Sequence, residues 1–287
     1  MNSAVWRSLL HRKPDTNKYD YGHMLIVGGS EAMTGAPILA ARAALRTGAG
    51  LVTIASTAQT VDIIDRDIEE IMTTALPSWN DDQACFRAVE AFMKERHVSV
   101  LVVGSGLPAA ADEVLRALIS GLDTPMVVDA EAFTALSGRL TLLKAATKRN
   151  GHIVLTPHPG EYTRLLSGAT EQYSADNERD SIRKFAQEYG VTLVLKRHHT
   201  LVANAHGDIY ENDTGNPGLA TAGSGDVLAG ILAGLLAQKV EIFDAAPMAV
   251  WLHGAAGDIA EELKTQPGMV ASDIIEAIPA VLKRLLP

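Results

Sequence analysis

The stretch HMLIVGGSEAMTGAPILAARAALRTGAGLVTIA, residues 23–55, predicts the first strand–helix–strand unit of an α/β fold. Its apolar run at 23–27 is short and continuous, as in a strand buried on both faces. A Gly-rich loop follows, then a helix predicted at 36–47 and a second strand at 51–55. Because a helix between two strands allows them to run parallel, the chain is expected to build a parallel sheet.

The same pattern continues along the chain and then changes. Further buried strands are predicted from apolar runs at 98–103, 126–129 and 152–155. Later runs lie only a few residues apart, a spacing that fits antiparallel hairpins and not helical crossovers. These later runs are expected to form a meander at one edge of the sheet, at 191–196, 200–203 and 208–210.

Two helices are predicted after the meander, at 226–238 and roughly 247–263. The first 20 or so residues are expected to be an N-terminal arm or an initial helix. Because the sequence has no internal repeat or linker-like stretch, residues 1–287 are interpreted as one domain. The predicted fold is doubly wound α/β, with a central mostly parallel sheet, helices on both faces and an antiparallel edge.

Composition and charge argue against several classes of protein. Of the 287 residues, 47% are hydrophobic and 21% are charged, the balance of a globular chain. A formal net charge of −9 argues against nucleic acid or an anionic membrane as a general partner. No secretion signal is expected, and the apolar run at 227–237 is shorter than the ~20 residues that span a bilayer. Cys85, the single cysteine, is interpreted as a core residue in a cytoplasmic protein.

The segment NDTGNPGLATAGSGDVLAGILAGLLAQ, residues 212–238, is the strongest candidate for a functional site. Its glycines, among them Gly223 and Gly225, precede a helix predicted to begin near Asp226. Glycine lets a ligand approach the backbone, and the free amides at a helix start attract an anion. Asp226 has two interpretations: a helix N-cap, or a base acting on a hydroxyl group beside a bound phosphate.

Other predicted strand ends carry Gly-rich or Pro-rich turns. The loop at 28–36 has neither G-x-G-x-x-G nor Walker A spacing, which disfavours a Rossmann or P-loop enzyme. A second turn, GSG, lies at 104–106. In TPHPGE, residues 156–161, two prolines flank His158, whose imidazole is expected to face outward at the carboxyl edge of the sheet. His158 and Glu161 also have plainer interpretations, as a hydrogen-bonded loop residue and as a charge at a helix N-terminus.

Four motifs, in this order, carry a resemblance to a known family. They are YGHMLIVGGSEAMTGAPILAARAALRTGAGLV, VVGSGL, LTPHPGEYTRLL and NPGLATAGSGDVLAG. From about Lys18 to its C-terminus, the chain resembles the ADP/ATP-dependent NAD(P)H-hydrate dehydratases of the ribokinase-like superfamily. It resembles the dehydratase domain alone, without the epimerase domain that is fused to it in some relatives.

The resemblance implies a hydro-lyase that repairs nicotinamide nucleotides. Its substrates would be the S epimers of hydrated NADH and NADPH. With Mg²⁺ present, ADP or ATP would phosphorylate the ring hydroxyl, and loss of phosphate would restore the ring double bond and leave AMP or ADP. Phosphate is a good leaving group and hydroxide a poor one, which accounts for the need for a nucleotide. The resemblance also suggests a homotetramer and a separate hydrate epimerase as a partner.

The resemblance also implies roles for individual residues. Asp226 would contact the substrate and take the hydroxyl proton, while the amides of Gly223, Ser224 and Gly225 would hold the charge on the transferred phosphoryl group. Positions that match contacts to the hydrated dinucleotide are Ala36, Gly106 and His158. Positions that match the adenine nucleotide site, besides Gly225, are Lys196, Arg197, His198, His199 and Thr200. Glu161 matches a carboxylate that acts through water near Mg²⁺ and the phosphates.

Two places depart from the usual family pattern. Ala222 and Ser224 stand where Gly and Thr are more common, but the retained hydroxyl and the small turn residue favour activity. Arg197 stands where a glycine commonly follows the lysine. Its bulk and charge therefore bear on the fit of the nucleotide and on the choice between ADP and ATP.

Other polar residues give weaker signals. Asp129 either faces the substrate site or caps a loop. His253 and Asp258, five residues apart on one predicted helix, are interpreted as core or interface residues. His198 and His199 are also interpretable as solvated turn residues, and no set of His, Cys and Asp has zinc spacing.

Two other functions stay open at this stage. A ribokinase-like kinase acting on a small alcohol, such as a vitamin precursor, would use Asp226 in the same way but release a stable phosphate ester. A catalytically silent nucleotide-binding or regulatory protein is the third possibility, and the intact Asp226 argues against it. The TPHPGE motif and the first Gly-rich loop favour the dehydratase, whereas fold analogy alone does not distinguish the three.

Overall fold

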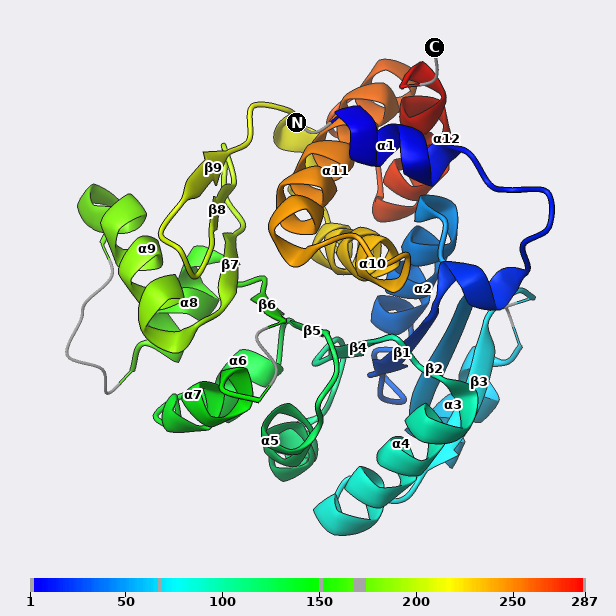
Figure 1. Ribbon diagram of the computed structural model, residues 1–287, viewed down its shortest axis with the longest axis vertical. Helices are drawn as coiled ribbons and strands as arrows, with labels where there is room; N and C mark the ends of the chain where they lie inside the picture. Colours follow the sequence, from blue (N-terminus) through cyan, green and yellow to red (C-terminus); the bar gives the residue numbers. More distant parts are fainter. Residues whose placement is uncertain (1–2, 67–68, 150–151, 168–173, 286–287) are drawn as a thin grey trace.

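The strands form a single mixed sheet at the centre of the molecule (Figure 1). The computed structural model describes residues 3–66, 69–149, 152–167 and 174–285. The strand order is β3-β2-β1-β4-β5-β6-β7-β8-β9, parallel from β3 to β7 and antiparallel from β7 to β9. The strands are β1 (His23–Val27), β2 (Leu51–Thr57), β3 (Met72–Leu76), β4 (Val100–Val103), β5 (Met126–Val128), β6 (Ile153–Leu155), β7 (Thr192–Leu195), β8 (Leu201–Ala203) and β9 (Ile209–Glu211). This arrangement confirms the predicted parallel sheet with an antiparallel edge.

The central strands are buried on both faces because alternate residues of each strand enter different cores. In β1, Met24 and Ile26 belong to one core, whereas Leu25 and Val27 belong to the other. All five residues of β1 are buried. A strand with two buried faces has no polar side. This explains why the strands could be predicted from continuous apolar runs in the sequence.

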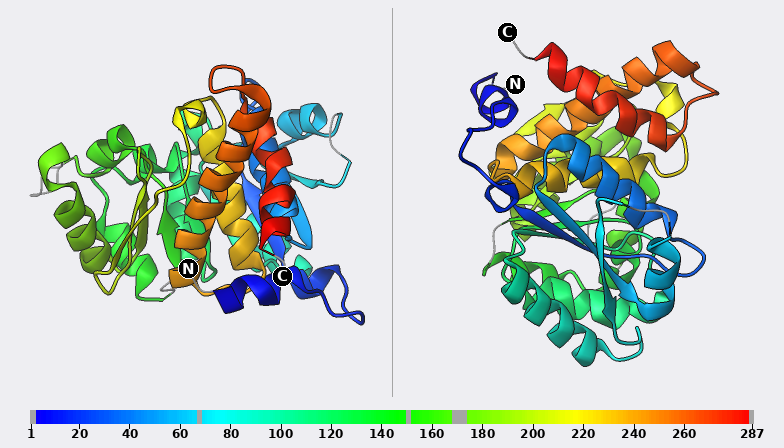
Figure 2. Two further views of the ribbon diagram at one scale, coloured as in Figure 1. Left: turned by 90° about the horizontal axis from the view of Figure 1, so that it is seen from above. Right: turned by 90° about the vertical axis from the view of Figure 1, so that its right-hand side faces the viewer.

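Helices cover both faces of the sheet (Figures 1 and 2). One face carries α2 (Gly35–Thr47), α10 (Ser224–Ala237), α11 (Ile242–Lys264) and α12 (Ala271–Arg284). The other carries α4 (Asp82–Arg96), α5 (Asp112–Gly121), α6 (Ala132–Leu136), α7 (Thr141–Thr147), α8 (Pro159–Leu165) and α9 (Glu178–Tyr189). Cys85 is buried in this second core, as predicted. The short helix α3 (Ala58–Ile64) packs beside β2 and β3.

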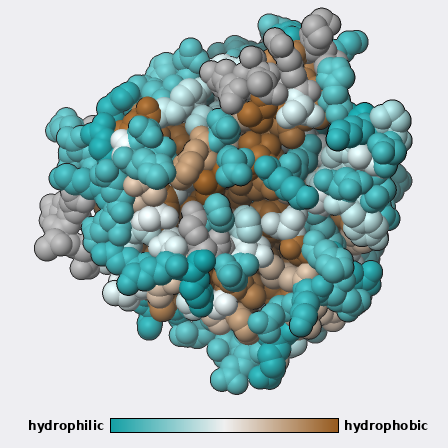
Figure 3. All heavy atoms as spheres, in the orientation of Figure 1, coloured by the Kyte–Doolittle hydropathy of each residue, from teal (hydrophilic) through white to brown (hydrophobic). Residues whose placement is uncertain are grey.

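The N-terminal segment, expected to be an arm or an initial helix, contains the helix α1 (Ser3–Leu10). Residues 1–2 of that segment lie outside the described residues. Trp6 of α1 is buried, and its ring lies 5.9 Å from that of Trp251 in α11. Figure 3 views the molecule from the side on which α1 lies and shows a largely polar surface, with apolar residues gathered near its centre. None of the described helices combines the length and the apolar character that crossing a bilayer requires.

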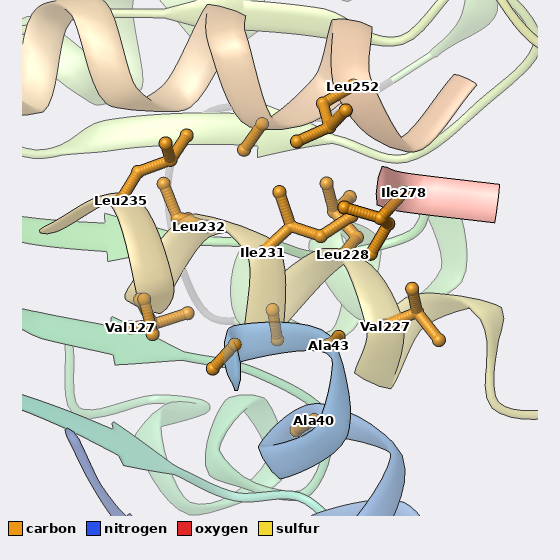
Figure 4. Packing of buried hydrophobic residues seen from close by; sticks show 14 of the residues in the cluster. Ala40, Ala43, Val127, Val227, Leu228, Ile231, Leu232, Leu235, Leu252 and Ile278 are labelled. Carbon is orange, nitrogen blue, oxygen red and sulfur yellow. The ribbon is translucent and has the colours of Figure 1, made fainter. Parts of the chain in front are cut away.

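Helix α10 packs against α2 with almost no space between the two backbones. A Cβ atom at Gly230 would overlap the carbonyl oxygen of Ala40, and one at Gly234 would lie 3.0 Å from that of Ala44. Figure 4 shows the larger side chains of α10 filling the space toward α11, α12 and the sheet. The run predicted at 227–237 is therefore a buried, closely packed helix.

Three elements differ from the expectations drawn from the sequence. Strand β3 was not predicted because two of the five residues in its sequence, MTTAL, are threonines and because it lies at an edge of the sheet with partly exposed side chains. Helix α10 begins at Ser224, two residues early, because Gly223 (φ +85°) makes the turn that ends just before it. Helix α11 begins at Ile242, so Pro247 lies inside it and removes one backbone donor from its second turn.

The contact between α2 and α10 predicts that two glycine-to-alanine substitutions change the free energy of unfolding by very different amounts. Gly230→Ala should lower the free energy of unfolding by about 1–3 kcal/mol, because the added methyl group collides with the backbone of α2. Gly35→Ala, at the first turn of α2 with open space around it, should leave stability unchanged or slightly increased. Urea unfolding at constant m-value measures both, and equal losses would contradict this account of the packing.

Candidate functional site

The candidate site lies at the carboxyl edge of the sheet, where the ends of parallel strands meet the N-terminus of α10. After β1, the Gly29 amide donates a hydrogen bond to the Ser105 carbonyl after β4 (2.9 Å). After β7, the Lys196 amide donates to the Pro157 carbonyl after β6 (2.8 Å). The Lys196 ammonium also reaches Asp129 after β5 (2.7 Å). These links connect the edge at which open α/β folds bind ligands.

The first Gly-rich loop and the GSG turn lie against each other. A Cβ atom at Gly106 would lie 2.7 Å from the Met33 carbonyl oxygen and 3.4 Å from the Ala36 Cβ. Gly106 also has φ +70°, a conformation that side chains disfavour. At Gly104, a Cβ atom would overlap the Asp129 carbonyl oxygen. Ala36 and Gly106, both predicted to contact the dinucleotide, are thus brought together at one point of the edge.

Asp226 is the third residue of α10, and the interpretation of this residue as an N-cap is wrong. The N-cap is Gly223, and no side chain caps the helix. Burial raises the pKa of Asp226 from 3.8 to about 6, and the nearby Asp129 carboxylate adds to this shift, whereas Ser105 and Lys196 oppose it. A carboxylate with a pKa near neutrality is suited to accept a proton.

Lys196 is a buried cation placed at the positive end of a helix. Its Nζ lies 2.7 Å from Asp129 Oδ1 and 3.7 Å from Glu161 Oε2, and a Cβ atom at Gly225 would lie 3.3 Å from it. Burial alone would lower the pKa of Lys196, but the carboxylates of Asp129, Glu161 and Asp226 raise it above its ordinary value. The ammonium and the first amides of α10 therefore direct positive potential at the same place, an arrangement that attracts an anion.

His158 is the N-cap of α8. Its Nδ1 accepts hydrogen bonds from the amides of Gly160 (3.0 Å) and Glu161 (3.3 Å), and the Glu161 carboxylate accepts one from the His158 amide (2.7 Å). About half of the His158 side chain is exposed, and its Nε2 lies 3.6 Å from Glu161 Oε1. The plainer interpretation of His158, as a hydrogen-bonded residue, is therefore confirmed. Its imidazole also lines the pocket described next, and its contact with the dinucleotide stays a prediction.

A pocket of about 640 Å³ opens beside these residues. The turn between β7 and β8 forms one wall, with Lys196, Arg197, His198, His199 and Thr200, the residues predicted to hold the nucleotide. The opposite wall is built from the segment at 212–221, the first turn of α10, and α11. Arg197 Nε is paired with Glu178 Oε2 of α9 (3.0 Å), so the charge of this unusual residue is held at the side of the pocket.

Helix α11 holds the pocket wall in place through side chains that the sequence did not assign to the site. Asp258 accepts a hydrogen bond from the Gly215 amide (3.0 Å), and Thr214 donates to the Trp251 carbonyl (3.0 Å). His253 Nε2 lies 3.1 Å from Ser224 Oγ, and burial lowers the pKa of His253 to about 4, so its imidazole is neutral. His253 and Asp258, interpreted from the sequence as core or interface residues, are partly buried and hold this wall, and His253 also lines the pocket.

Asp129 was also weighed as a loop cap, and its carboxylate instead forms the buried ion pair with Lys196. No single stretch of sequence contains this pairing, since 67 residues separate the partners. The same is true of Ser224 and His253, 29 residues apart. Only their position at the ends of predicted strands and helices could have suggested these contacts.

Within residues 3–66, 69–149, 152–167 and 174–285, no group of three or more His, Cys, Asp or Glu side chains is arranged to hold a metal ion. Glu161 is engaged by His158 and Lys196. This donor set does not form an all-protein metal cage. It fits an ion such as Mg²⁺, which keeps several waters and binds chiefly to substrate phosphates with one or two carboxylates nearby.

Comparison with known proteins adds an independent finding. The family model described as NAD(P)H-hydrate dehydratase matches residues 24–280. The chain is 38% identical to the ADP-dependent (S)-NAD(P)H-hydrate dehydratase of Neisseria meningitidis over 93% of this chain and 86% of that one. It is 42% identical to the bifunctional NAD(P)H-hydrate repair enzyme Nnr of Moorella thermoacetica, over 99% of this chain but only 54% of that protein, so it spans about half the length of this relative.

The fold comparison agrees with the sequence comparison. The ADP/ATP-dependent NAD(P)H-hydrate dehydratase of Bacillus subtilis, co-crystallized with ATP and Mg²⁺, superposes with a TM-score of 0.83 at 27% identity. The superposition covers 100% of this chain and 98% of that one. On its motifs, its ribokinase-like fold and these matches, the chain belongs to the NAD(P)H-hydrate dehydratase family.

Proposed function

We propose that this chain dehydrates the S epimers of hydrated NADH and NADPH, with ADP or ATP as the phosphoryl donor. The observation that carries the proposal is the position of Asp226. This carboxylate, with a pKa near 6, lies in the first turn of α10, beside the Lys196 ammonium and the helix amides. A base next to an anion site is what phosphoryl transfer to a hydroxyl group requires.

In this mechanism Asp226 takes the proton of the ring hydroxyl while the hydroxyl oxygen attacks the terminal phosphorus of the nucleotide. The bond to the departing AMP or ADP breaks, and the amides of Gly223, Ser224 and Gly225 stabilise the charge on the transferred group. Lys196 lies against Gly225 and adds a positive charge at the same place. Phosphate then leaves with its C–O bond electrons, pushed by the ring nitrogen lone pair, and loss of a ring proton restores the double bond.

The two substrates are assigned to different parts of the site. The adenine nucleotide occupies the pocket between the β7–β8 turn and α11, with Lys196–Thr200 on one side. The hydrated dinucleotide lies toward Ala36, Gly106 and His158. Mg²⁺ bound to the nucleotide would neutralise phosphate charge, with Glu161 holding it through water.

We further propose that residues 1–287 form one catalytic domain and that it assembles as a homotetramer. Bifunctional relatives such as the Moorella thermoacetica protein are about twice as long as this chain. We also propose that a hydrate epimerase works with this domain and supplies the S epimer.

The first test is absorbance at 340 nm with hydrated NADH, Mg²⁺ and either ADP or ATP. We expect a rise that depends on the nucleotide and is matched by release of inorganic phosphate, because the product contains the restored dihydropyridine. The better donor shows how Arg197 bears on nucleotide choice. No rise with either donor, in folded protein, would favour the kinase of another alcohol, which releases a stable phosphate ester.

Asp226→Asn should lower kcat by about 10²- to 10⁴-fold, since it removes the proposed base while keeping the shape of the side chain. ADP affinity, measured by calorimetry, should stay similar or increase, because a negative charge near the phosphates is lost. Asp123→Asn is the matched control: Asp123 is exposed and precedes β5 at the opposite edge of the sheet. Equal loss of turnover and ADP binding in Asp226→Asn would indicate a structural role.

The raised pKa of Asp226 predicts a specific pH dependence. Only the ionised carboxylate accepts a proton, so kcat/KM should fall about tenfold per pH unit below roughly pH 6. An aspartate with its ordinary pKa of 3.8 would leave the rate flat down to about pH 5. The measurement is a pH–rate profile in protein checked for folding at each pH, and a flat profile from pH 5 to 7 would contradict the assignment.

A further inference from the structure

The hydroxyl group of Ser105 is a buried polar group without a hydrogen bond. Ser105 is completely inaccessible to solvent. In the part of the chain that the structure describes, its Oγ is the only buried side-chain nitrogen or oxygen that lacks a hydrogen-bond partner. Leaving such a group unsatisfied costs about 1–3 kcal/mol, so a retained instance calls for a physical reason.

The backbone of Ser105 is fixed, so its hydroxyl can be redirected only by rotation about the Cα–Cβ bond. The Ser105 carbonyl accepts a hydrogen bond from the Gly29 amide (2.9 Å), and a Cβ atom at Gly28 would lie 2.7 Å from the same oxygen. On its other side, the Gly106 amide donates to Glu131 Oε2 (3.2 Å). The turn is therefore held from both sides, by the loop after β1 and by the segment after β5.

Ser105 and Asp226 lie at the same point of the carboxyl edge. A Cβ atom at Gly104, next to Ser105, would overlap the Asp129 carbonyl oxygen, while the Lys196 ammonium that pairs with Asp129 also lies against Gly225, next to Asp226. The hydroxyl is near enough to lower the pKa of Asp226, although the pair does not reach the geometry of a normal hydrogen bond. The other charged groups that act on Asp226 are Asp129 and Glu131 after β5, which raise its pKa, and Lys196 after β7, which lowers it. Lys196 is already paired with Asp129, which leaves Ser105 as a donor that has no other use.

We propose that Ser105 is a positioning residue for Asp226. In the free protein the Ser105 O–H already stabilises the ionised Asp226 carboxylate through one of its oxygens, which leaves the other oxygen free to take the ring hydroxyl proton once the hydrated dinucleotide binds. Ser105 acts through Asp226 and does not itself react. The inference rests on the proposed function, in which Asp226 is the base.

The test compares pH–rate profiles of the wild type and of Ser105→Ala. Loss of the donor should move the acidic limb of kcat/KM up by about one pH unit, so the rate at pH 6 falls several-fold while the rates converge above pH 8. A purely structural role would lower the rate equally at every pH. Ser181→Ala is the matched control, because Ser181 is equally buried but paired with Tyr162 (3.0 Å) on the far face of the sheet. Its acidic limb should not move.

Ser105→Cys separates hydrogen bonding from packing, because a thiol fills the space but donates weakly. We expect its acidic limb to shift upward as in Ser105→Ala. Two results would overturn the proposal. One is an unshifted acidic limb of kcat/KM in Ser105→Cys. The other is a Ser105→Ala variant whose KM for the hydrate rises while its acidic limb stays in place.

A measurement without turnover keeps this inference separate from the proposed function. NMR titration of the Asp226 carboxyl carbon, assigned with Asp226→Asn, gives its pKa in the free protein. Ser105→Ala should raise that pKa, and an unchanged value would reject the role of Ser105. A raised pKa in a protein that fails the 340 nm assay would support the contact between Ser105 and Asp226 while rejecting the dehydratase reaction.

Discussion

A helix that is apolar on every side needs cover on every side, and α10 obtains it from the sheet, α2, α11 and α12. This burial leaves only the two ends of the helix open. At its C-terminal end the chain closes over it, since a Cβ atom at Gly22 would overlap the Ala237 carbonyl oxygen. Its N-terminal end opens onto the carboxyl edge of the sheet. The packing that removes apolar side chains from water therefore also delivers the amides of Ser224 and Gly225 to the strand ends.

The buried charges at the carboxyl edge of the sheet lower the stability of the folded chain. A pKa of about 6 for Asp226, against 3.8 when unperturbed, means that ionising it is harder in the folded chain than in the unfolded one. The unfolded chain loses this proton first, so stability falls as the pH rises from about 4 to 6, by about 3 kcal/mol at most. The ion pair of Lys196 and Asp129 limits a similar penalty for burying the ammonium. Replacing Asp226 by a neutral residue would relieve this penalty but would remove the base that we propose.

Much of the fold could be predicted because each buried parallel strand corresponds to a short apolar stretch that is visible in the sequence itself. The runs at 24–27 and 100–103 are apolar without interruption, and the glycines after them mark the turns. Strand β3 has no such stretch, because two of its five residues are threonines and it is stabilised by pairing with β2 at an edge. Within the candidate site, Asp226 was singled out from its local motif. The contacts that support the site, such as that of His253 with Ser224, join distant segments and follow from tertiary packing alone.

The close approach of α2 and α10 at Gly230 also has a mechanical consequence. Helices separated by flexible side chains can shift by about 1–2 Å when a ligand binds, whereas helices that touch through backbone atoms cannot do so without collision. The N-terminal end of α10, where we propose that the phosphoryl group binds, is therefore a rigid reference point. Under the same proposal, adjustment to nucleotides of different length falls to two other segments of the pocket wall, the β7–β8 turn and residues 212–221. Divergence in donor preference among related proteins should accumulate in those two segments and spare the helix.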